Sequence, residues 1–225
     1  MARSRTADND GPVGLFTTLP ILWNEANDVA GMLKSADPPH WARTAIAARG
    51  PVSGLDTLAG PGGRGPLDSL KRLVIAQPRP LSPDENVALD AWVRGGGQLL
   101  LLADPALTAE SAFAVGDPRR PQAVVLLSPI LARWGLDLHF DDAQPFGERT
   151  GEVMGMAVPV NLPGHFTTRG QSNCRLWGEG LAASCAIGQG RVIAVADAAV
   201  LERDDPAGTR AKALNGLLDA AFVGR

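Results

Sequence analysis

The sequence contains no tyrosine, and aromatic residues make up only 5% of the 225-residue chain. A surface on which bases or sugars stack is therefore disfavoured. The net charge is only −3, from 21 basic and 24 acidic residues, so the basic footprint of a nucleic-acid-binding protein is missing. No run of 18 apolar residues occurs, and we expect no membrane insertion by this chain.

The first 14 residues are polar and charged and lack the apolar core of a signal peptide. The sequence as written therefore predicts a cytoplasmic protein. A periplasmic location is the alternative if an upstream anchor or signal has been removed.

The chain has only two cysteines, Cys174 and Cys185, which flank a two-residue hairpin turn predicted at Glu179-Gly180. Counting outward from that turn places them opposite each other on neighbouring antiparallel strands. The same count assigns them to a hydrogen-bonded pair, in which the Cα atoms lie farther apart. Two reduced, buried thiols are therefore favoured over a disulfide, which would indicate a protein outside the cytoplasm. Two cysteines are too few to hold zinc.

Apolar residues make up 45% of the chain, and the clearest pattern among them is a strand–helix–strand unit. Its two apolar strands, at 72–77 and 98–103, do not alternate with polar residues, so both of their faces should be covered. The helix between them begins at Ser82, with Glu85 completing a capping box and Pro83 in the first helical position. Such a unit predicts an α/β fold with a parallel sheet.

The same reasoning extends to the rest of the chain. Four parallel core strands are predicted at 13–17, 72–77, 98–103 and 191–196, with shorter strands at 52–56 and 136–140. The predicted helices cover residues 24–34, 40–49, 82–94, 128–134 and 209–223.

We expect a flexible N-terminus over residues 1–11 and a single α/β domain over 12–225. Between about 145 and 190, short alternating segments separated by glycines predict an antiparallel β meander added to the main sheet. Residues 105–127 form a long connection, which in a compact domain is usually functional or an insertion.

Three segments carry a family resemblance. They read GLFTTLPILW, VIAQP…LSPDENVALDAWVRGGGQLLLLADP and GQGRVIAVADAAVL. Together they resemble the GldG-like auxiliary domain of ABC-type transport systems, within the class I glutamine-amidotransferase-like superfamily. The matching positions are Leu81, Ser82, Glu85, Gly95, Gly96, Gly188, Gly190, Arg191, Val192 and Asp197. The resemblance implies a flavodoxin-like fold and a partner in an ABC transporter or envelope complex.

The residues of a glutaminase are missing from this pattern. The turns after two core strands read AQPRP and ADPAL, neither cysteine follows such a strand, and no histidine is followed two residues later by glutamate. The resemblance therefore implies the scaffold without its catalytic cysteine. The three histidines are scattered and no serine has a GxSxG context, so we predict no catalytic residue, metal or cofactor.

The predicted parallel strands end in polar residues: Thr17 and Thr18, Gln77, Asp104 and Asp197. Because ligands of open parallel sheets bind beyond the carboxyl ends of the strands, these residues form the candidate ligand site. For both aspartates a competing role, capping the segment that follows, is the favoured one.

If this edge binds a ligand, residues 105–121 of the connection after Asp104 are expected to fold over it as a lid. This segment carries Arg119 and Arg120, residues suited to carboxylate or phosphate, which are added to the candidate site. A solvated loop held by Asp117–arginine contacts is the favoured alternative.

Three functions remain open. The first is a non-catalytic, amidotransferase-like domain that binds a small molecule or a protein partner, as an auxiliary component of an ABC-type transport system. The second is a hydrolase of unknown substrate that uses carboxylates at the carboxyl edge of the sheet. The third is a structural subunit that forms a homodimer through the antiparallel strands.

Overall fold

The structure is a computed structural model, and it describes residues 11–23, 25, 40–202, 205 and 207–222. Residues 1–10 of the predicted flexible N-terminus lie outside the described residues. The helix predicted at 24–34 does so too, apart from Glu25.

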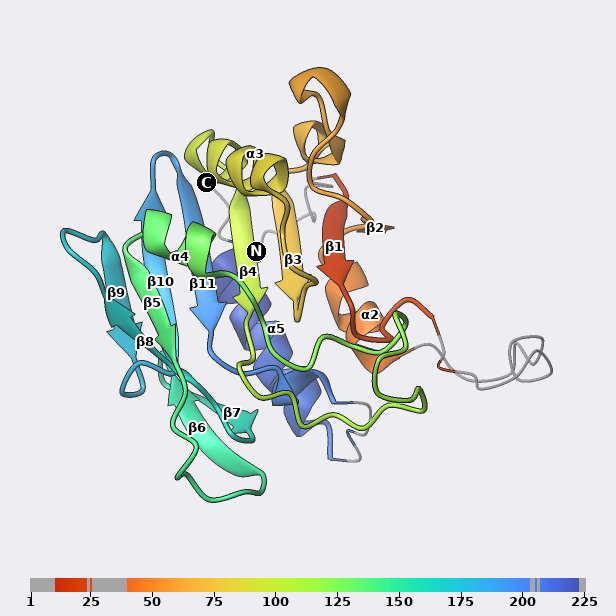
Figure 1. The fold of residues 1–225 in the computed structure, drawn as a ribbon, viewed down its shortest axis with the longest axis vertical. Coiled ribbons are helices and arrows are strands. Elements are labelled where there is room, and N and C mark those ends of the chain that lie inside the picture. The colour runs from red at the N-terminus through yellow and green to blue at the C-terminus, as the bar shows by residue number, and fades with distance from the viewer. Residues whose placement is uncertain (1–10, 24, 26–39, 203–204, 206, 223–225) are drawn as a thin grey trace, which may run out of the picture.

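A seven-stranded sheet forms the centre of the molecule (Figure 1). Its first five strands are parallel, and the last two run antiparallel to their neighbours. In spatial order the strands are β2 (Val52–Gly54), β1 (Val13–Thr17), β3 (Arg72–Ala76), β4 (Gln98–Leu102), β11 (Gly190–Val195), β10 (Ala182–Ile187) and β9 (Cys174–Trp177). The four predicted core strands are confirmed as parallel members of one sheet. Counted along the chain, the five parallel strands have the order 2-1-3-4-5, which is the order of flavodoxin-like sheets.

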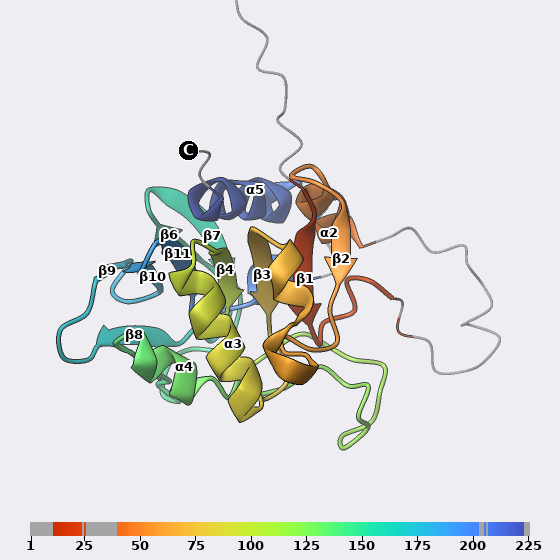
Figure 2. The ribbon, with the colours of Figure 1, turned by 90° about the horizontal axis from the view of Figure 1, so that it is seen from above.

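Helices cover both faces of the parallel sheet (Figure 2). On one face α2 (Trp41–Ala47) packs against α5 (Thr209–Ala221), and on the other lie α3 (Pro83–Arg94) and α4 (Ser128–Arg133). Leu100 and Leu102 belong to the first hydrophobic core, whereas Leu99 and Leu101 belong to the second. Two covered faces explain why this strand has no apolar–polar alternation.

Helix α3 begins at the predicted capping box. Ser82 Oγ accepts from the backbone N–H of Glu85 at 3.2 Å, and the Glu85 carboxylate accepts from the Ser82 N–H at 2.9 Å. Glu85 also binds Arg79 at 2.8 Å and the buried backbone N–H of Leu58 at 3.1 Å. The segment before the 3₁₀ helices η1 (Pro61–Gly63) and η2 (Pro66–Ser69) is thereby tied to α3.

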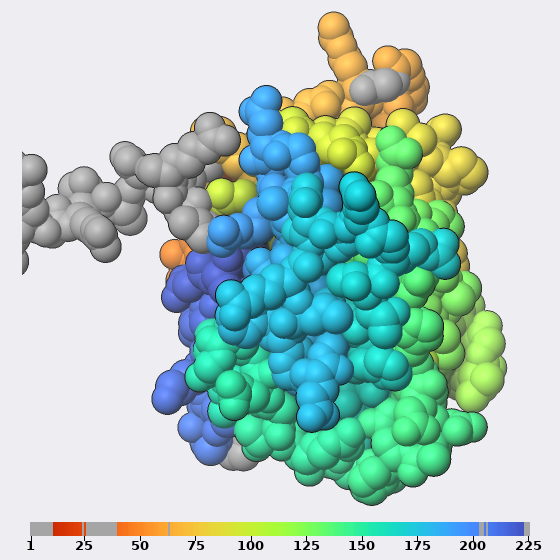
Figure 3. Space-filling view, turned by 90° about the vertical axis from the view of Figure 1, so that its left-hand side faces the viewer, coloured from red at the N-terminus to blue at the C-terminus, as the bar shows by residue number. Residues whose placement is uncertain are grey.

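The predicted meander is antiparallel, but it does not form one continuous sheet. Strands β9 and β10 extend the main sheet, while β6 (Arg149–Val153) pairs with β7 (Met156–Val160) alone. Strand β8 (His165–Thr168) pairs with β5 (Leu136–His139), which lies before the predicted insertion. The added strands and their connections, in green to blue, cover the face seen in Figure 3.

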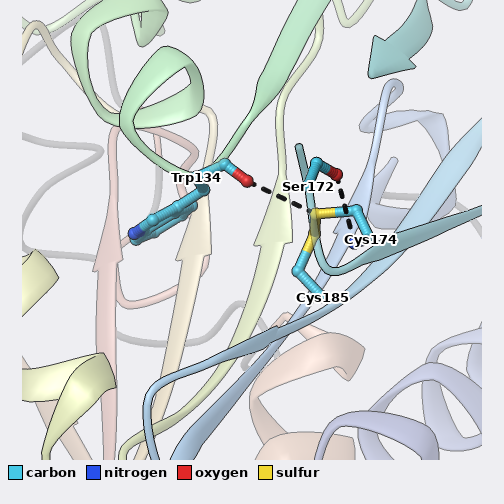
Figure 4. The surroundings of a disulfide bond; sticks show 4 residues. All are labelled: Trp134, Ser172, Cys174 and Cys185. Carbon is cyan, nitrogen blue, oxygen red and sulfur yellow. Dashed lines mark hydrogen bonds between the residues drawn. A yellow bond between two sulfur atoms is a disulfide. The ribbon is translucent and has the colours of Figure 1, made fainter. Parts of the chain in front are cut away.

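The cysteines lie opposite each other on β9 and β10, as predicted, but they form a disulfide (Figure 4). The turn between the strands has four residues, 178–181, instead of two. Because Ala186 donates to the Asn173 carbonyl at 3.1 Å, the next pair, Cys174 and Cys185, occupies a non-hydrogen-bonded site. Their Cα atoms are 4.0 Å apart, so the expectation of two reduced thiols is wrong for this structure.

Candidate functional site

The residues that follow the parallel strands form what we call the carboxyl edge: Thr17, Thr18, Gln77, Asp104 and Asp197. Thr18 Oγ1 donates to the Gln77 carbonyl at 2.5 Å. The Gln77 side chain is fully buried; its Nε2 donates to the Asp104 carbonyl, and its Oε1 accepts from the Asp104 N–H, both at 3.0 Å. Thr17 Oγ1 accepts from the Leu19 N–H at 2.9 Å and stabilises the turn after β1. The edge residues from β1, β3 and β4 therefore bind one another.

The last part of the long connection, residues 122–125, lies against this edge, directly after the segment 105–121 that we expected to cover it. The backbone N–H of Gln122 donates to Thr18 Oγ1 at 3.0 Å, and Gln77 Nε2 donates to the Gln122 carbonyl at 2.6 Å. Val125 N–H donates to the Asp104 carbonyl at 3.1 Å. These contacts occupy polar groups where β1 adjoins β3, the strand-order reversal at which ligands of such sheets bind. Gln122 acts through its backbone, so its side chain gave no sequence signal.

Asp104 and Asp197 both hold backbone N–H groups. Asp104 Oδ1 accepts from Ala106 at 2.8 Å and its Oδ2 from Ala198 at 3.2 Å. Asp197 Oδ1 accepts from Ala199 at 2.5 Å and its Oδ2 from Asn161 at 2.8 Å. All four carboxylate oxygens are thus engaged, and the geometry fits the capping role that the sequence favoured.

Burial has a large effect on these two acids, whose exposed fractions are 0% and 1%. Desolvation raises the pKa of Asp104 to about 6, although two backbone hydrogen bonds oppose it. Desolvation and the nearby charge of Asp104 raise the pKa of Asp197 to about 8. Glu202 contributes in the same direction at both sites, a neighbour that the sequence did not reveal.

The two candidate arginines bind within the long connection itself. Arg119 pairs with Asp117 at 2.7 Å, lies 4.2 Å from the centre of the Phe113 ring, and lowers the pKa of Asp117 to about 2. Arg120 donates to the Phe113 carbonyl at 2.6 Å. The structure therefore supports the alternative in which contacts of these arginines hold the loop itself together.

Within the described ranges, no group of three or more His, Cys, Asp or Glu residues is placed to hold a metal ion. The helices of that same part of the chain include none long and apolar enough to cross a membrane. Hollows occur at several places on the surface. One of about 620 Å³ lies beside α3, and one of about 600 Å³ lies among the strands of the meander.

No protein-family model matches this chain, and no curated protein matches it. Solved structures do. The exo-β-1,4-mannosidase Op5Man5 from an Opitutaceae bacterium is 16% identical with a TM-score of 0.52, over 95% of this chain and 36% of that one. Gan42B, a GH42 β-galactosidase from G. stearothermophilus, is 11% identical with a TM-score of 0.50, over 83% of this chain and 27% of that one. A ThuA-like protein from Parabacteroides merdae is 12% identical with a TM-score of 0.44, over 96% and 91% of the two chains.

These similarities define the class of fold and no more. The chain spans about a third of the length of the two glycosidases. It is a mixed α/β protein with a mostly parallel central sheet and additional antiparallel strands.

The capping role of Asp104 makes a prediction. Asp104→Ala should lower the free energy of unfolding by about 2 kcal/mol, because the buried N–H of Ala198 and the partly buried N–H of Ala106 lose their acceptor. Urea denaturation measures this change. The control Asp137→Ala, which breaks a half-exposed pair with Arg169, should cost less than about 1 kcal/mol. Unchanged stability, together with loss of a ligand-induced rise in melting temperature, would restore Asp104 as a ligand-binding residue.

Proposed function

We propose that this chain is a non-catalytic, amidotransferase-like α/β domain that binds a protein partner through the loops at its carboxyl edge. The partner belongs to a transport or envelope assembly, as the resemblance to GldG-like auxiliary domains suggests. The support for a protein partner is the distribution of exposed apolar side chains.

Three segments, which we call the edge loops, carry most of these side chains: residues 18–23, 105–127 and 140–148. Val115 is 90% exposed and Phe146 is 80% exposed. The same loops carry the other exposed apolar residues Trp23, Val124, Leu126 and Phe140. Among the described residues, the remaining large apolar side chain of this kind is Val87 on α3. Loops at one end of a sheet that carry several exposed apolar side chains are candidates for an interaction surface.

The third edge loop reaches the carboxyl edge through contacts with the segment after β7. Gly147 donates to Asn161 Oδ1 at 3.1 Å, and the backbone N–H of Asn161 donates to Asp197. Gly164 donates to the Ala196 carbonyl at 2.7 Å. The loop is therefore fixed beside the end of β11.

The interior of the edge favours this proposal over a hydrolase. Both carboxylates are buried, and each of their oxygens accepts a backbone N–H, so neither is presented to a water molecule or a substrate. A general base must lie within hydrogen-bonding reach of the proton that it removes.

The disulfide supports an oxidising compartment as the place where this chain folds, the periplasm being the alternative named from the sequence. Disulfides persist in such compartments and are rare in the cytosol. Alkylation of the protein in freshly broken host cells tests this. Both cysteines should resist the reagent until a reductant is added, and immediate alkylation of both would favour the cytoplasm.

Site-specific photocrosslinking tests the partner. A photoreactive residue in place of Phe146 or Val115 should give one discrete adduct with a second protein in host cells, because both positions lie on the edge loops. The same residue in place of Val87, which is 69% exposed on α3, is the matched control and should give none. Equal background at all three positions would contradict the proposal. An adduct of two copies of this chain would support the dimerising subunit instead.

A further inference from the structure

Asp104 and Asp197, which we call the carboxylate clasp, join three segments that are distant in the sequence. The two residues follow neighbouring parallel strands, whose last paired residues are Leu102 and Val195. Their carboxylates accept from consecutive N–H groups, Asp104 from Ala198 and Asp197 from Ala199, at the start of the 3₁₀ helix η3 (Ala199–Leu201).

The remaining oxygen of each carboxylate holds another segment. Asp104 binds the N–H of Ala106, where the long connection begins. Asp197 binds the N–H of Asn161, directly after β7. The carboxylate clasp therefore links the long connection, η3 and the antiparallel strands.

Among the described residues, no cation binds the clasp. In the part of the chain that the structure describes, no arginine, lysine or histidine hydrogen-bonds either carboxylate. Arg210 on α5 is nearby, but it binds the Ala199 carbonyl, Glu202 at 3.1 Å and Glu148. Asp205 accepts from the first N–H groups of α5. Among the described residues, the charged groups joined to η3 and to the start of α5 are therefore Glu148, Glu202, Asp205 and Arg210, of which three are acids.

Two buried carboxylates without a cation are unfavourable when both are ionised. We propose that the carboxylate clasp is a pH-controlled device, which holds the long connection, η3 and the end of β7 together in acid and loosens them as the pH rises. The proposal rests on no partner, so its failure would leave the proposed function untouched.

Proton linkage gives the direction in which the stability of the clasp changes with pH. Burial raises the pKa of both acids above the ordinary value of 3.8, so the closed clasp binds more protons than the open one. Its stability is full below about pH 4 and is lost progressively up to about pH 8, the pKa of Asp197. If opening releases one proton, the opening constant rises about tenfold for each pH unit in this range.

Hydrogen exchange on the full chain, corrected for intrinsic rates, measures this opening. From pH 5 to pH 8, protection of peptides covering 105–110, 161–164 and 197–201 should fall at least tenfold, while peptides from α3 keep theirs. Asp197→Asn keeps one acceptor oxygen but cannot ionise. Its protection should start lower, and the pH dependence that remains should be weaker than in the wild type and should end near pH 6, the pKa of Asp104.

Asp104→Asn removes the other charge independently and should also weaken the pH dependence, since burial alone then raises the pKa of Asp197; it provides the test if Asp197→Asn does not fold. The control Asp137→Asn should keep the full pH dependence. Wild-type protection that does not change between pH 5 and pH 8 would overturn the proposal. So would an unaltered slope in the asparagine variants.

Discussion

Replacing Glu85 with alanine is expected to lower the free energy of unfolding by about 3 kcal/mol. Glu85 is 2% exposed and serves as both a helix cap and a tertiary tether. Its loss removes the acceptor of the Ser82 N–H, worth about 1 kcal/mol in comparable caps. It also leaves the buried N–H of Leu58 without its partner, which costs about 1–3 kcal/mol. Arg79 is partly exposed and can be rehydrated, so it adds less.

Glu85 also accounts for part of the stability that the protein is expected to lose in acid. Hydrogen bonds from Arg79, together with those from backbone groups, outweigh burial and lower the pKa of Glu85 from 4.5 to about 2. The stability that this carboxylate contributes is therefore present above about pH 4.5 and is lost as the pH falls towards 2. Urea denaturation at several pH values should show a smaller acid loss in Glu85→Gln than in the wild type.

Asp84→Asn is the matched control, since it changes an exposed carboxylate in the same first turn of α3. It should cost less than about 1 kcal/mol, the usual range for a charge at a helix terminus. If Glu85→Ala and Asp84→Asn were equally mild, the tether between α3 and the 57–58 segment would have no energetic importance.

The second large effect concerns the disulfide. Reducing it should lower the free energy of unfolding by about 2–3 kcal/mol, because the bond closes a loop with a sequence separation of 11 in the unfolded chain. It also holds β9, the four-residue strand at the edge of the sheet, against β10. Denaturation with and without a reductant measures the difference.

The double variant Cys174→Ala/Cys185→Ala is the control for the reductant. It should start at the lower stability and show no response to reduction. A reductant effect below about 0.5 kcal/mol on the wild type would show that the bond does not stabilise the fold.

The core of the fold was predictable because its signals are local. Non-alternating apolar runs give the four parallel strands, and the capping box at Ser82 gives the start of α3. The pairing of β5 with β8 was not predicted, since it joins segments on either side of a hairpin, and no local pattern reports such a pairing. The cysteine register was right and the redox state wrong. Whether the two cysteines form a hydrogen-bonded or a non-hydrogen-bonded pair depends on whether the turn has two residues or four. The sequence did not show the length of the turn.

The sequence predicted where the candidate site lies but not which groups the site residues bind. The strand ends identified Thr18, Gln77, Asp104 and Asp197, and capping was the favoured role for both aspartates, but the sequence did not reveal that distant backbone groups would occupy the polar groups of Thr18 and Gln77. The groups that bind there are backbone atoms of distant residues such as Gln122. A backbone group can be supplied by a residue of any type, so the sequence carries no signal for it. The exposure of the apolar residues on the edge loops depends on how those loops lie on the sheet, and so it also required the structure.

The central claim is that the edge loops bind a protein partner, and substitution of their apolar side chains tests it most directly. Phe146→Ser/Val115→Ser should abolish co-purification with the partner identified by crosslinking, because both side chains are exposed and contribute little to the core. Its melting temperature should match that of the wild type, and Val87→Ser should retain the partner. Undiminished co-purification in the double variant, or equal loss in Val87→Ser, would contradict the account.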